Sequence, residues 1–548
     1  MELPDTQIEL PALDAFINAA LREDRLAKAQ FCDGLLQFRD HHGVRVRIGL
    51  KARSGLRILC NGTILHGEGS AAHQISIRDL LTDLSAAGGS LFQARVLDSL
   101  DAICAAPQRQ GRADQWTFAQ AEQALKAGHA FHPNPRSRDE MTLAEAERYA
   151  PEHAGIFGLQ WVAARPDHVQ INPDAERLFR TLAQADLGTT PDDLIPLPWH
   201  PWQAKQLFQT DDMQTLYSAG VLKDLGEGSG SWTATSSMRC LHATHAPFMV
   251  KTSLSLRLTN SVRHLSLREV LRGIHVSDLL RSDLGKQIKR DFPTLHILGE
   301  PGYAALRDMS GNILDPTITV LRDNPFRDAT SNGPVLLAAL CEPSPHGPSP
   351  LGGLLIRLGP DAPKKWFTQF LNVVVWPILE LRARYGLLFG AHQQNLMVGL
   401  SEGWPVAGWV RDCQGTGHLD SFTDRLTQAC PGIGEGTENI VDAELGDGLV
   451  TYYVVVNSVL NTLATLVLDD LTEEQDLHDI WRNFLIRARI QTPGDDTLYT
   501  RLLDRSTLTC KGNFTTSISG MNEADGDARG QIATFFELSN PIAETLDA

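Results

Sequence analysis

Apolar and polar positions alternate most regularly between residues 248 and 259. The alternation sets five apolar residues against five polar ones: Phe248, Val250, Leu254, Leu256 and Leu258 against Lys251, Ser253, Ser255, Arg257 and Thr259. This two-residue period is typical of a strand with one apolar face. Residues 237–240 alternate in the same way, and His245-Ala-Pro247 between the two segments is typical of a turn. The pattern therefore predicts two antiparallel strands.

Other parts of the chain favour helices. Helical periodicity is predicted for residues 10–26, 80–100 and 117–127, and again for 366–379, where Pro377 predicts a kink. Short strands are predicted around residues 43–67, and short strand-like runs dominate residues 155–341. Residues 343–350 alternate Pro with Ser and Gly and are the clearest linker. We therefore expect an α+β protein.

A second pattern occupies residues 390–415. Gly390-Ala-His392-Gln-Gln-Asn395 is polar, Leu396-Met-Val398 is apolar, and Gly408-Trp-Val-Arg411-Asp412 ends shortly before Gly415. The order predicts a polar turn, a short strand, another turn and a second short strand. Its polar residues belong to the candidate site.

Composition limits the classes of function. The chain has 548 residues with 42% hydrophobic and 21% charged residues, typical of a soluble globular enzyme. Its formal charge of −17 argues against nucleic acid or an anionic membrane as the main partner. The eight cysteines follow no metal-binding spacing, and no export signal is visible, so we expect reduced thiols in a cytosol. The apolar run 452–468 contains polar residues, which favours a buried helix over a membrane span.

Three cations recur at intervals of twelve: Arg239, Lys251 and Arg263. A turn centred on His245 would place Arg239 directly opposite Lys251, at a cost of about 0.2–1 kcal/mol that a bound anion would remove. On this reading, Lys251→Ala should leave the fold intact. Asn260-Ser261 is typical of a helix start, which would add a partial positive charge near Arg263. The alternative is that the facing cations point separately into solvent.

Further polar residues are candidates for a nucleotide site. His392 and Asn395 on one turn, with Asp412 at the end of the next strand, form a set suited to a nucleotide phosphate and Mg²⁺. His129 and His132 lie in a proline-rich loop with Arg136 and Arg138, where binding of a carboxylate is preferable to binding of a metal. The glycine-rich segment 226–232 lacks the ending of a Walker-type phosphate loop, and we expect a mobile loop that closes over the nucleotide.

With these residues the chain resembles the NRPS-independent siderophore synthetases of the aerobactin synthetase type. The matching motifs follow one another through most of the chain: Gly128-His129-Ala-Phe-His132-Pro133 with Arg136 and Arg138, Tyr149-Ala-Pro-Glu152, His200-Pro-Trp-Gln203, Thr235-Ser-Ser-Met-Arg239, Lys251, Thr259-Asn-Ser-Val-Arg263, His392-Gln-Gln-Asn395, Arg411-Asp412 and Cys510-Lys511-Gly. Three positions depart from the family's pattern. Cys240 stands where Thr is usual, Gly390 where Glu is frequent and Arg136 where Lys is common.

The resemblance implies a cupped-hand architecture. Its parts would be an N-terminal thumb (1–154), a β-rich fingers domain carrying the basic residues (155–345) and a mostly helical palm with the His/Asn/Asp set (346–548). The nucleotide would lie between fingers and palm. The family also implies a homodimer.

The resemblance further implies ATP-dependent adenylation of citrate or a citryl conjugate, followed by capture with an amine or alcohol. ATP and Mg²⁺ would be required. The implied nucleotide contacts are Ser237, Arg239, Lys251, Arg263, His392, Gln394 and Asn395, with Arg263 and His392 catalytic. Asp412 would bind the metal, and His129, His132, Arg136 and Arg138 the acid.

Two other functions stay open at this point. A small-molecule kinase would use the same His/Asn/Asp set on the γ-phosphate, although no carboxylate base accompanies His392. A non-catalytic member of the fold is the second alternative, which the changes at Cys240 and Gly390 keep open.

Overall fold

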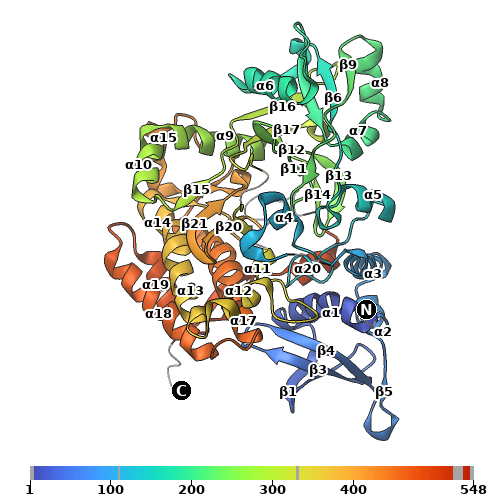
Figure 1. The fold of residues 1–548 in the computed structure, drawn as a ribbon, viewed down its shortest axis with the longest axis vertical. Helices are drawn as coiled ribbons and strands as arrows, with labels where there is room; N and C mark the ends of the chain where they lie inside the picture. The colour runs from blue at the N-terminus through green and yellow to red at the C-terminus, as the bar shows by residue number, and fades with distance from the viewer. Residues whose placement is uncertain (1–4, 109–110, 329–331, 523–534, 544–548) are drawn as a thin grey trace.

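The computed structural model describes residues 5–108, 111–328, 332–522 and 535–543. It is an α+β protein, elongated in the view of Figure 1, with an N-terminal sheet at one end and a larger group of strands and short helices at the other. The helices of the C-terminal third lie along one side between these two ends.

The N-terminal unit is a five-stranded antiparallel meander packed on three helices. Its helices are α1 (Asp5–Arg22), α2 (Ile77–Ala86) and α3 (Ser90–Ala105). Its strands run in the order β1 (Ala27–Cys32), β2 (Leu35–Arg39), β3 (Arg45–Arg53), β4 (Ile58–His66) and β5 (His73–Gln74). Leu13, Phe16 and Ile17 on α1 are buried at helical spacing, which makes the core-facing stripe that the sequence predicts. The single helix expected over 80–100 is two helices, because the chain breaks at Gly88-Gly89, where Gly89 has φ 89°.

The central unit is built around a six-stranded sheet. Its strands follow the order β10 (Thr233–Ala234), β11 (Cys240–His242), β12 (Phe248–Thr252), β17 (Thr319–Asp323), β16 (Gly302–Leu306) and β7 (Val169–Ile171). A three-stranded sheet accompanies it: β8 (Ile195–Trp199), β6 (Gln160–Ala164) and β9 (Leu222–Glu227). Strands do not dominate residues 155–341 as predicted, because the described part of this region also holds six α-helices: the short α11 (Leu337–Leu340), α6 (Ala175–Leu187), α7 (Pro201–Leu207), α8 (Asp211–Ser218), α9 (Leu267–Arg281) and α10 (Asp283–Asp291).

The long strand predicted over 248–259 is two strands in different sheets. β12 ends at Thr252, and β13 (Leu254–Leu258) forms a hairpin with β14 (Ser261–Arg263). The chain turns at Ser253, whose N–H donates to the Ile318 carbonyl and whose Oγ donates to the Asp315 carbonyl. The helix start predicted at Asn260 is also wrong. Thr259, with φ 58°, turns the chain into β14 instead.

Two further sheets, one of four strands and one of three, contain the pattern of strands and turns predicted for residues 390–415. The four strands are β15 (Leu295–Ile297), β21 (Trp404–Val410), β20 (Leu396–Ser401) and β18 (Val335–Leu336), and the three are β19 (Leu387–Leu388), β22 (Gly417–Leu419) and β23 (Ile440–Val441). The hairpin β20–β21 confirms the predicted strand, turn and strand before Asp412.

The C-terminal third is mostly helical. Its helices are α12 (Pro350–Leu358), α13 (Ala362–Phe370), α14 (Trp376–Tyr385), α15 (Thr423–Ala429), α16 (Ala443–Val450), α17 (Asn461–Leu468), α18 (Glu474–Gln491), α19 (Thr497–Asp504) and α20 (Asn513–Ser519). A hairpin of β24 (Thr507–Lys511) and β25 (Phe535–Ser539) completes it. Short helices α4 (Phe118–Gln123), α5 (Leu143–Tyr149) and α11 (Leu337–Leu340) lie elsewhere in the chain. The predicted kink near Pro377 is a π-helical segment, Leu371–Val375, which joins α13 to α14. Proline lacks the N–H of a regular helical turn, and a wider turn accommodates it.

Four hydrophobic clusters of described residues hold these elements together. One joins residues 10–103 with Phe514, a second joins residues 146–321, a small one joins residues 265–320, and the largest extends from Ala113 to Ile542. The largest cluster contains residues on both sides of segment 343–349, so that segment does not separate two cores; the domain limits themselves stay a prediction. The apolar helix Ala443–Leu468 is long enough to cross a membrane, but 89% of its most apolar window is buried, as the sequence predicts.

Candidate functional site

One cavity of about 330 Å³ receives side chains from all three parts of the chain. Every residue predicted for the site lines it: His129, His132, Arg136, Arg138, Ser237, Arg239, Lys251, Arg263, His392, Gln394, Asn395 and Asp412. Sequence spacing alone could not bring these residues together, because the first and the last of them, His129 and Asp412, are 283 positions apart. The fold places them around a single space.

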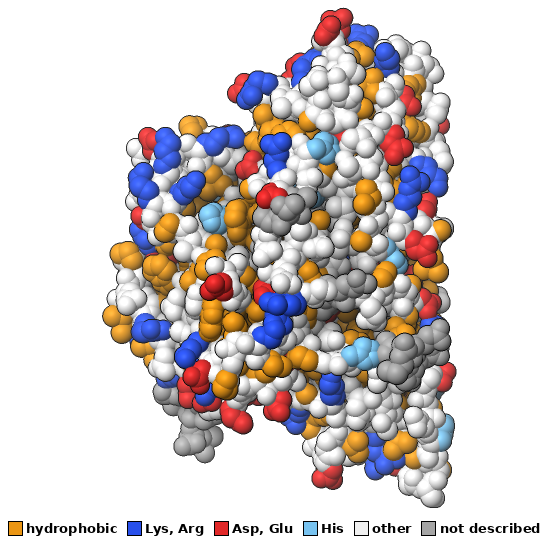
Figure 2. Space-filling view, viewed as in Figure 1, with side chains coloured by type: hydrophobic (Ala, Val, Ile, Leu, Met, Phe, Trp, Pro, Cys, Tyr) orange, Lys and Arg blue, Asp and Glu red, His pale blue; other side chains and the backbone are white. Residues whose placement is uncertain are grey.

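The lining of the cavity is strongly cationic. Eight Lys or Arg side chains contribute to it: Arg136, Arg138, Arg239, Lys251, Arg263, Arg322, Arg411 and Lys511. Among the described residues the only acid in the lining is Asp412. On the face seen in Figure 2, by contrast, side chains of both signs are interspersed. In a chain of net charge −17, a local excess of cations is the arrangement that attracts a polyanion.

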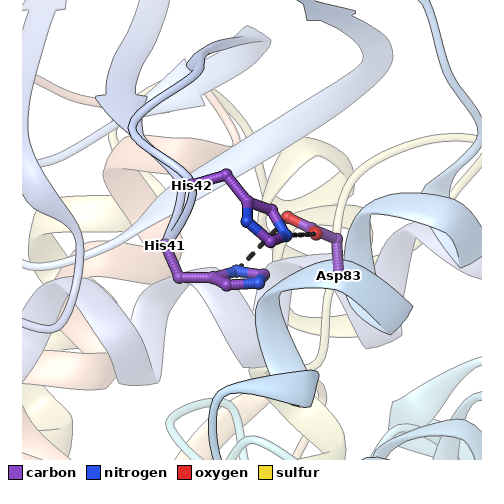
Figure 3. Close-up of side chains that lie close together, drawn as sticks. All are labelled: His41, His42 and Asp83. Carbon is purple, nitrogen blue, oxygen red and sulfur yellow. Dashed lines mark ion pairs between the residues drawn. The ribbon is translucent and has the colours of Figure 1, made fainter.

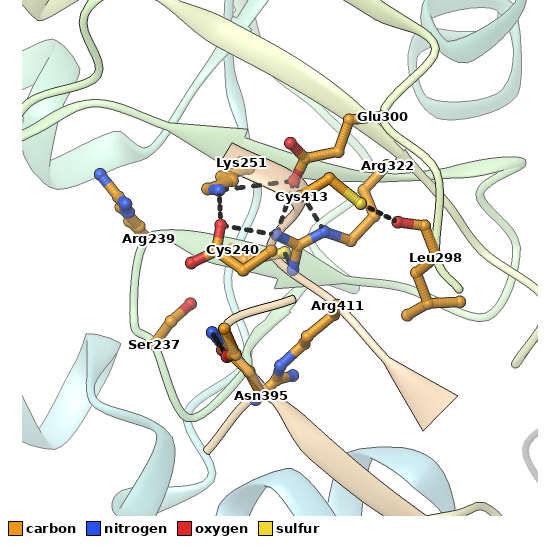
Figure 4. A network of polar contacts seen from close by, with 12 residues as sticks. Ser237, Arg239, Cys240, Lys251, Leu298, Glu300, Arg322, Asn395, Arg411 and Cys413 are labelled. Carbon is orange, nitrogen blue, oxygen red and sulfur yellow. Dashed lines mark hydrogen bonds and ion pairs between the residues drawn. The ribbon is translucent and has the colours of Figure 1, made fainter. Parts of the chain in front are cut away.

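Lys251 lies in a buried ion network rather than opposite another cation (Figure 4). Its Nζ contacts Asp412 Oδ1 closely and lies 3.4 Å from Glu300 Oε1. Arg322 lies 2.7 Å from Glu300 and 3.5 Å from Asp412. Burial disfavours the charged form of Asp412, but Lys251, Arg322 and Arg239 outweigh it and hold its pKa well below the usual range. Asp412 is therefore an anion that the cavity's cations share.

The predicted facing pair of Arg239 and Lys251 is wrong. Cys240 is the residue opposite Lys251, so the turn is centred between His245 and Ala246, and the register moves by one position. A shift of one residue changes the face on which a side chain lies. Arg239 still reaches the cavity, where its Nη1 donates to the carbonyls of Arg263 and His264, each at 3.3 Å. Those carbonyls orient the guanidinium without neutralising it.

Arg263 occupies the end of β14 and braces the hairpin that carries it. Its Nη2 donates to the Leu258 carbonyl at 2.9 Å and to Thr259 Oγ1 at 3.0 Å. The helix predicted to begin at Asn260-Ser261 is not formed, because the next helix in the chain, α9, begins only after Ser266. The predicted dipole contribution from a helix at Asn260 is therefore wrong.

The turn 392–395 presents His392 and Asn395 to the cavity. The backbone N–H of Gln394 donates to His392 Nδ1 at 3.2 Å, so the neutral ring carries its proton on Nε2. Burial lowers the pKa of His392 to about 4, and the ring is neutral at pH 7. His392 is thus a hydrogen-bond donor through Nε2. Asn395 Nδ2 donates to the Gly390 carbonyl at 3.3 Å, a bond that does not use its amide oxygen.

Arg411 is a positioning residue that sequence reasoning did not include in the site. Its Nη1 lies 2.6 Å from Glu122 Oε1, while its Nη2 donates to Ser236 Oγ and to the Gln394 carbonyl. Glu122 also accepts the N–H of Ser236 at 2.9 Å. Gln394 itself donates through Nε2 to the Ser236 carbonyl. These bonds fix the turn 392–395 against the segment that carries Ser237, and only the match of Arg411 to the family motif could have suggested its importance.

Residues 129–138 form a loop without helix or strand, as predicted. The two arginines of this loop share one carboxylate partner. Arg138 and Arg136 both pair with buried Glu152. Burial opposes ionisation of Glu152, but the two guanidinium groups lower its pKa to about 2. Burial and neighbouring cations lower the pKa of His129 well below its usual value. The loop therefore presents the neutral imidazole of His129 beside a net positive group.

The C-terminal part of the chain supplies further lining that the sequence reasoning did not predict. Tyr452, Tyr453 and Asn457 come from the buried helical segment, and Lys511 and Asn513 follow β24. Three non-glycine residues of the lining, Met238, Thr259 and Asp412, have φ between 58° and 68°. Backbone held in this sparsely populated region concentrates at functional sites.

The glycine-rich segment 226–232 does not line the cavity. Ser229 Oγ donates to Asp186 at 2.6 Å, and Trp232 Nε1 donates to the same carboxylate at 2.8 Å. In this structure the segment is held by Asp186, which does not support the predicted lid over a nucleotide. Gly390 also lies outside the lining, and a Cβ there would meet only ordinary contacts at 3.8–4.0 Å.

Asp412 and Asn395 fit a hard divalent cation. Both line the cavity and offer oxygen ligands, the type that Mg²⁺ prefers. The depressed pKa of Asp412 keeps its carboxylate ionised. Lys251 holds the same carboxylate, so a cation at this place requires Lys251 to find another anionic partner.

Comparisons with known proteins show which family the chain resembles. Residues 117–342 match the model of the IucA / IucC family, and residues 364–526 match a model described as ferric iron reductase FhuF-like transporter. The chain is 35% identical over 450 residues to a rhizobactin siderophore biosynthesis protein, RhbC, of Rhizobium meliloti, covering 79% of this chain and 76% of that protein. It is 33% identical over 449 residues to the N(2)-citryl-N(6)-acetyl-N(6)-hydroxylysine synthase of Escherichia coli, covering 78% and 76%.

A solved structure of similar fold is that of ATP-bound aerobactin synthetase IucA from a hypervirulent pathotype of Klebsiella pneumoniae. The TM-score is 0.87 at 27% identity, over 97% of this chain and 99% of that chain. The extent and identity of these matches confirm the resemblance first seen in the motifs. This chain belongs to the IucA / IucC family of siderophore synthetases.

Proposed function

We propose that this protein is an ATP-dependent siderophore synthetase that adenylates a carboxylate of citrate or a citryl conjugate and joins it to an amine or alcohol. The observation that carries the proposal is the cavity in which eight cations surround one acid. Related proteins named as citryl-hydroxylysine synthase, spermidine-citrate ligase and aerobactin synthase support a citrate-based condensation. The similar structure described as ATP-bound supports the nucleotide.

The two chemical steps set different demands on the site. In the first, a substrate carboxylate attacks the α-phosphorus of ATP and pyrophosphate leaves. In the second, an amine or hydroxyl attacks the acyl carbon, loses its proton, and AMP leaves. Both ATP and citrate are polyanions, so fixed cations must offset their repulsion. Arg239, Lys251 and Arg263 are proposed to hold the phosphates together with Ser237 and Gln394.

The turn 392–395 is proposed to act where charge develops. His392 carries its proton on Nε2 and is neutral at pH 7, so it donates a hydrogen bond to an oxygen of the α-phosphate without exchanging a proton. Arg263 adds charge stabilisation there. Mg²⁺, held by Asp412 and Asn395, would screen the phosphates and polarise them. The ammonium group of Lys251 would then leave Asp412 and pair with a phosphate oxygen instead.

The acid is proposed to bind beside the loop 129–138. His129, His132, Arg136 and Arg138 line that part of the cavity. Because the two arginines share Glu152, the group contributes a net single positive charge, with the imidazoles as hydrogen-bond donors or acceptors.

We also propose the thumb, fingers and palm division at residues 154 and 345, a homodimer and a cytoplasmic location. All eight cysteines lie in described residues and none forms a disulfide, which supports a reducing compartment.

The products of turnover test this function against a kinase. The protein is incubated with Mg²⁺-ATP, citrate and hydroxylamine, and the nucleotides are resolved. We expect AMP, pyrophosphate and a citryl hydroxamate; ADP with a phosphorylated acceptor would establish the kinase alternative instead. Arg239→Ala should lose the activity, whereas Arg177→Ala, which removes an exposed cation outside the cavity, should retain it. If citrate gives no product, citryl conjugates and 2-oxoglutarate are tested as acids by the same assay.

A further inference from the structure

A cluster of two histidines and an aspartate lies outside the cavity, in the N-terminal unit. His41 and His42 occupy the turn between β2 and β3, and Asp83 lies on α2 (Figure 3). His41 Nδ1 is 3.7 Å from Asp83 Oδ2, and His42 Nε2 is 3.8 Å from Asp83 Oδ1. The two imidazole rings are 3.8 Å apart at their centroids. One potential ligand atom from each residue lies within 4.8 Å of the others.

The turn that carries the histidines is fixed by a buried carboxylate. Asp40 Oδ1 accepts the N–H groups of His42 and Val44 at 2.9 and 2.8 Å. Asp40 Oδ2 lies 2.8 Å from His66 Nε2 on β4. The side chain of Asp40 is fully buried, so its bonds hold the turn to the sheet. The two histidines are therefore presented by a rigid support.

The element that carries Asp83 is equally well anchored. α2 begins at a capping box formed by Ser76 and Asp79, which satisfies the first backbone N–H groups of the helix. Leu80 and Leu81 on the same helix are buried in the cluster that also contains Phe38 of β2. Both sides of the three-residue cluster thus rest on one hydrophobic core, and their separation is set by its packing.

We propose that His41, His42 and Asp83 form a binding site for a late first-row divalent ion of the Zn²⁺ class. Zinc binds imidazole nitrogen and carboxylate oxygen at about 2.0–2.2 Å, and tetrahedral geometry then separates neighbouring ligand atoms by roughly 3.3–3.5 Å. Because one ligand atom of each residue already lies within 4.8 Å of the others, movements of up to about 1.5 Å bring the three atoms to this spacing. Mg²⁺ and Ca²⁺ prefer oxygen ligands alone and are disfavoured by two imidazoles.

Water completes the coordination, because the cluster faces solvent. His42 keeps 66% of its side chain exposed, His41 33% and Asp83 30%. The bound ion ties the β2–β3 turn to α2, and it does so away from the cavity, whose lining contains none of the three residues.

Calorimetric titration of the whole protein with ZnCl₂ tests the site. Exposed Cys32 is also a zinc ligand by chemistry, so the titration uses Cys32→Ser as the parent protein. We expect one binding event that His42→Ala and Asp83→Asn each weaken at least tenfold. His73→Ala removes an exposed histidine of the same sheet that is not in the cluster, and it should bind as the parent does.

A second measurement separates loss of the site from loss of the fold. Zn²⁺ should raise the melting temperature of the parent and of His73→Ala but not that of His42→Ala. Ligase turnover, measured after removal of excess zinc, should be equal in all these variants. Equal zinc affinity in the parent and His42→Ala, or no binding by the parent, would overturn the proposal.

Discussion

Lys251 and Asp412 form an ion pair across the cavity. The pair joins β12 of the six-stranded sheet to the segment that directly follows β21, where Asp412 lies. A magnesium nucleotide would bind both groups: the Lys251 ammonium suits a phosphate, and the Asp412 carboxylate suits the metal. In the structure without ligand they satisfy each other. On the proposed function, binding would replace this internal ion pair with two contacts to the ligand.

Lys251→Ala tests the structural part of this relationship. Lys251 is 2% exposed, and its removal leaves Asp412 and Glu300 with Arg322 as their remaining partner in the network. Breaking a buried pair in this way costs about 3 kcal/mol, so the variant should melt below the parent and gain less from ATP. Differential scanning calorimetry with and without nucleotide measures both effects. An unchanged melting temperature would show that Lys251 does not stabilise the fold through this network.

Asp412→Asn tests the proposed metal site. An amide is a weaker ligand for Mg²⁺ than a carboxylate, and the variant should lose turnover at every Mg²⁺ concentration by about 10²-fold or more. Cys240→Thr, which changes a buried neighbour of Arg322, is the matched control and should change turnover far less. The assay is hydroxamate formation against Mg²⁺ concentration. Substantial magnesium-dependent activity in Asp412→Asn would remove Asp412 from the metal site.

His200 should make the folded protein sensitive to acid. Burial lowers its pKa from 6.5 to about 3, and the side chain is fully buried at the start of α7. The unfolded chain binds this proton at higher pH than the folded one, so stability is full above pH 6.5 and falls as the pH drops towards 3. The loss is about 3 kcal/mol between pH 6.5 and 4.

His200→Asn is the variant that isolates this contribution. Asn also accepts the N–H of Trp202 as a helix cap, but it does not titrate. Urea unfolding at pH 7 and at pH 4.5 should show a smaller pH dependence in the variant than in the parent. An identical dependence in both would show that His200 does not bear this proton.

The nucleophile is expected to lack a second ammonium group. Asp412 is the sole acid in the described lining, and it is already shared by Lys251 and Arg322. A polyamine would bring a charge with no fixed anion to receive it, whereas an amine bearing a carboxylate or a neutral amide would not. We expect kcat/KM to be at least about tenfold higher for N6-acetyl-N6-hydroxylysine than for spermidine, a difference of about 1.4 kcal/mol. Equal or better use of spermidine, with AMP still formed, would contradict this without affecting the proposed adenylation.

Local patterns in the sequence identified elements whose hydrophobic face repeats without interruption. The helical stripe of α1, the hairpin β20–β21 and the helix around Pro377 were all predicted, because side-chain period and turn residues are local properties. The candidate residues were also found in the sequence, since their motifs match those of a family. Their convergence on one cavity was not visible there.

Tertiary contacts decided what local pattern could not. The alternation from 248 to 259 continues across Ser253, yet bonds from Ser253 to the turn at 315–318 bend the chain into a second sheet. The centre of the turn between β11 and β12 lies half a residue further along the chain than the sequence suggested. Cys240 rather than Arg239 therefore lies opposite Lys251. The partners of Lys251 come from the segment after β21 and from the segment before β16, far away in sequence. The sequence by itself therefore determined which groups are present and their chemistry, whereas only the packed structure determined which charges meet, because electrostatic pairing depends on distance in space.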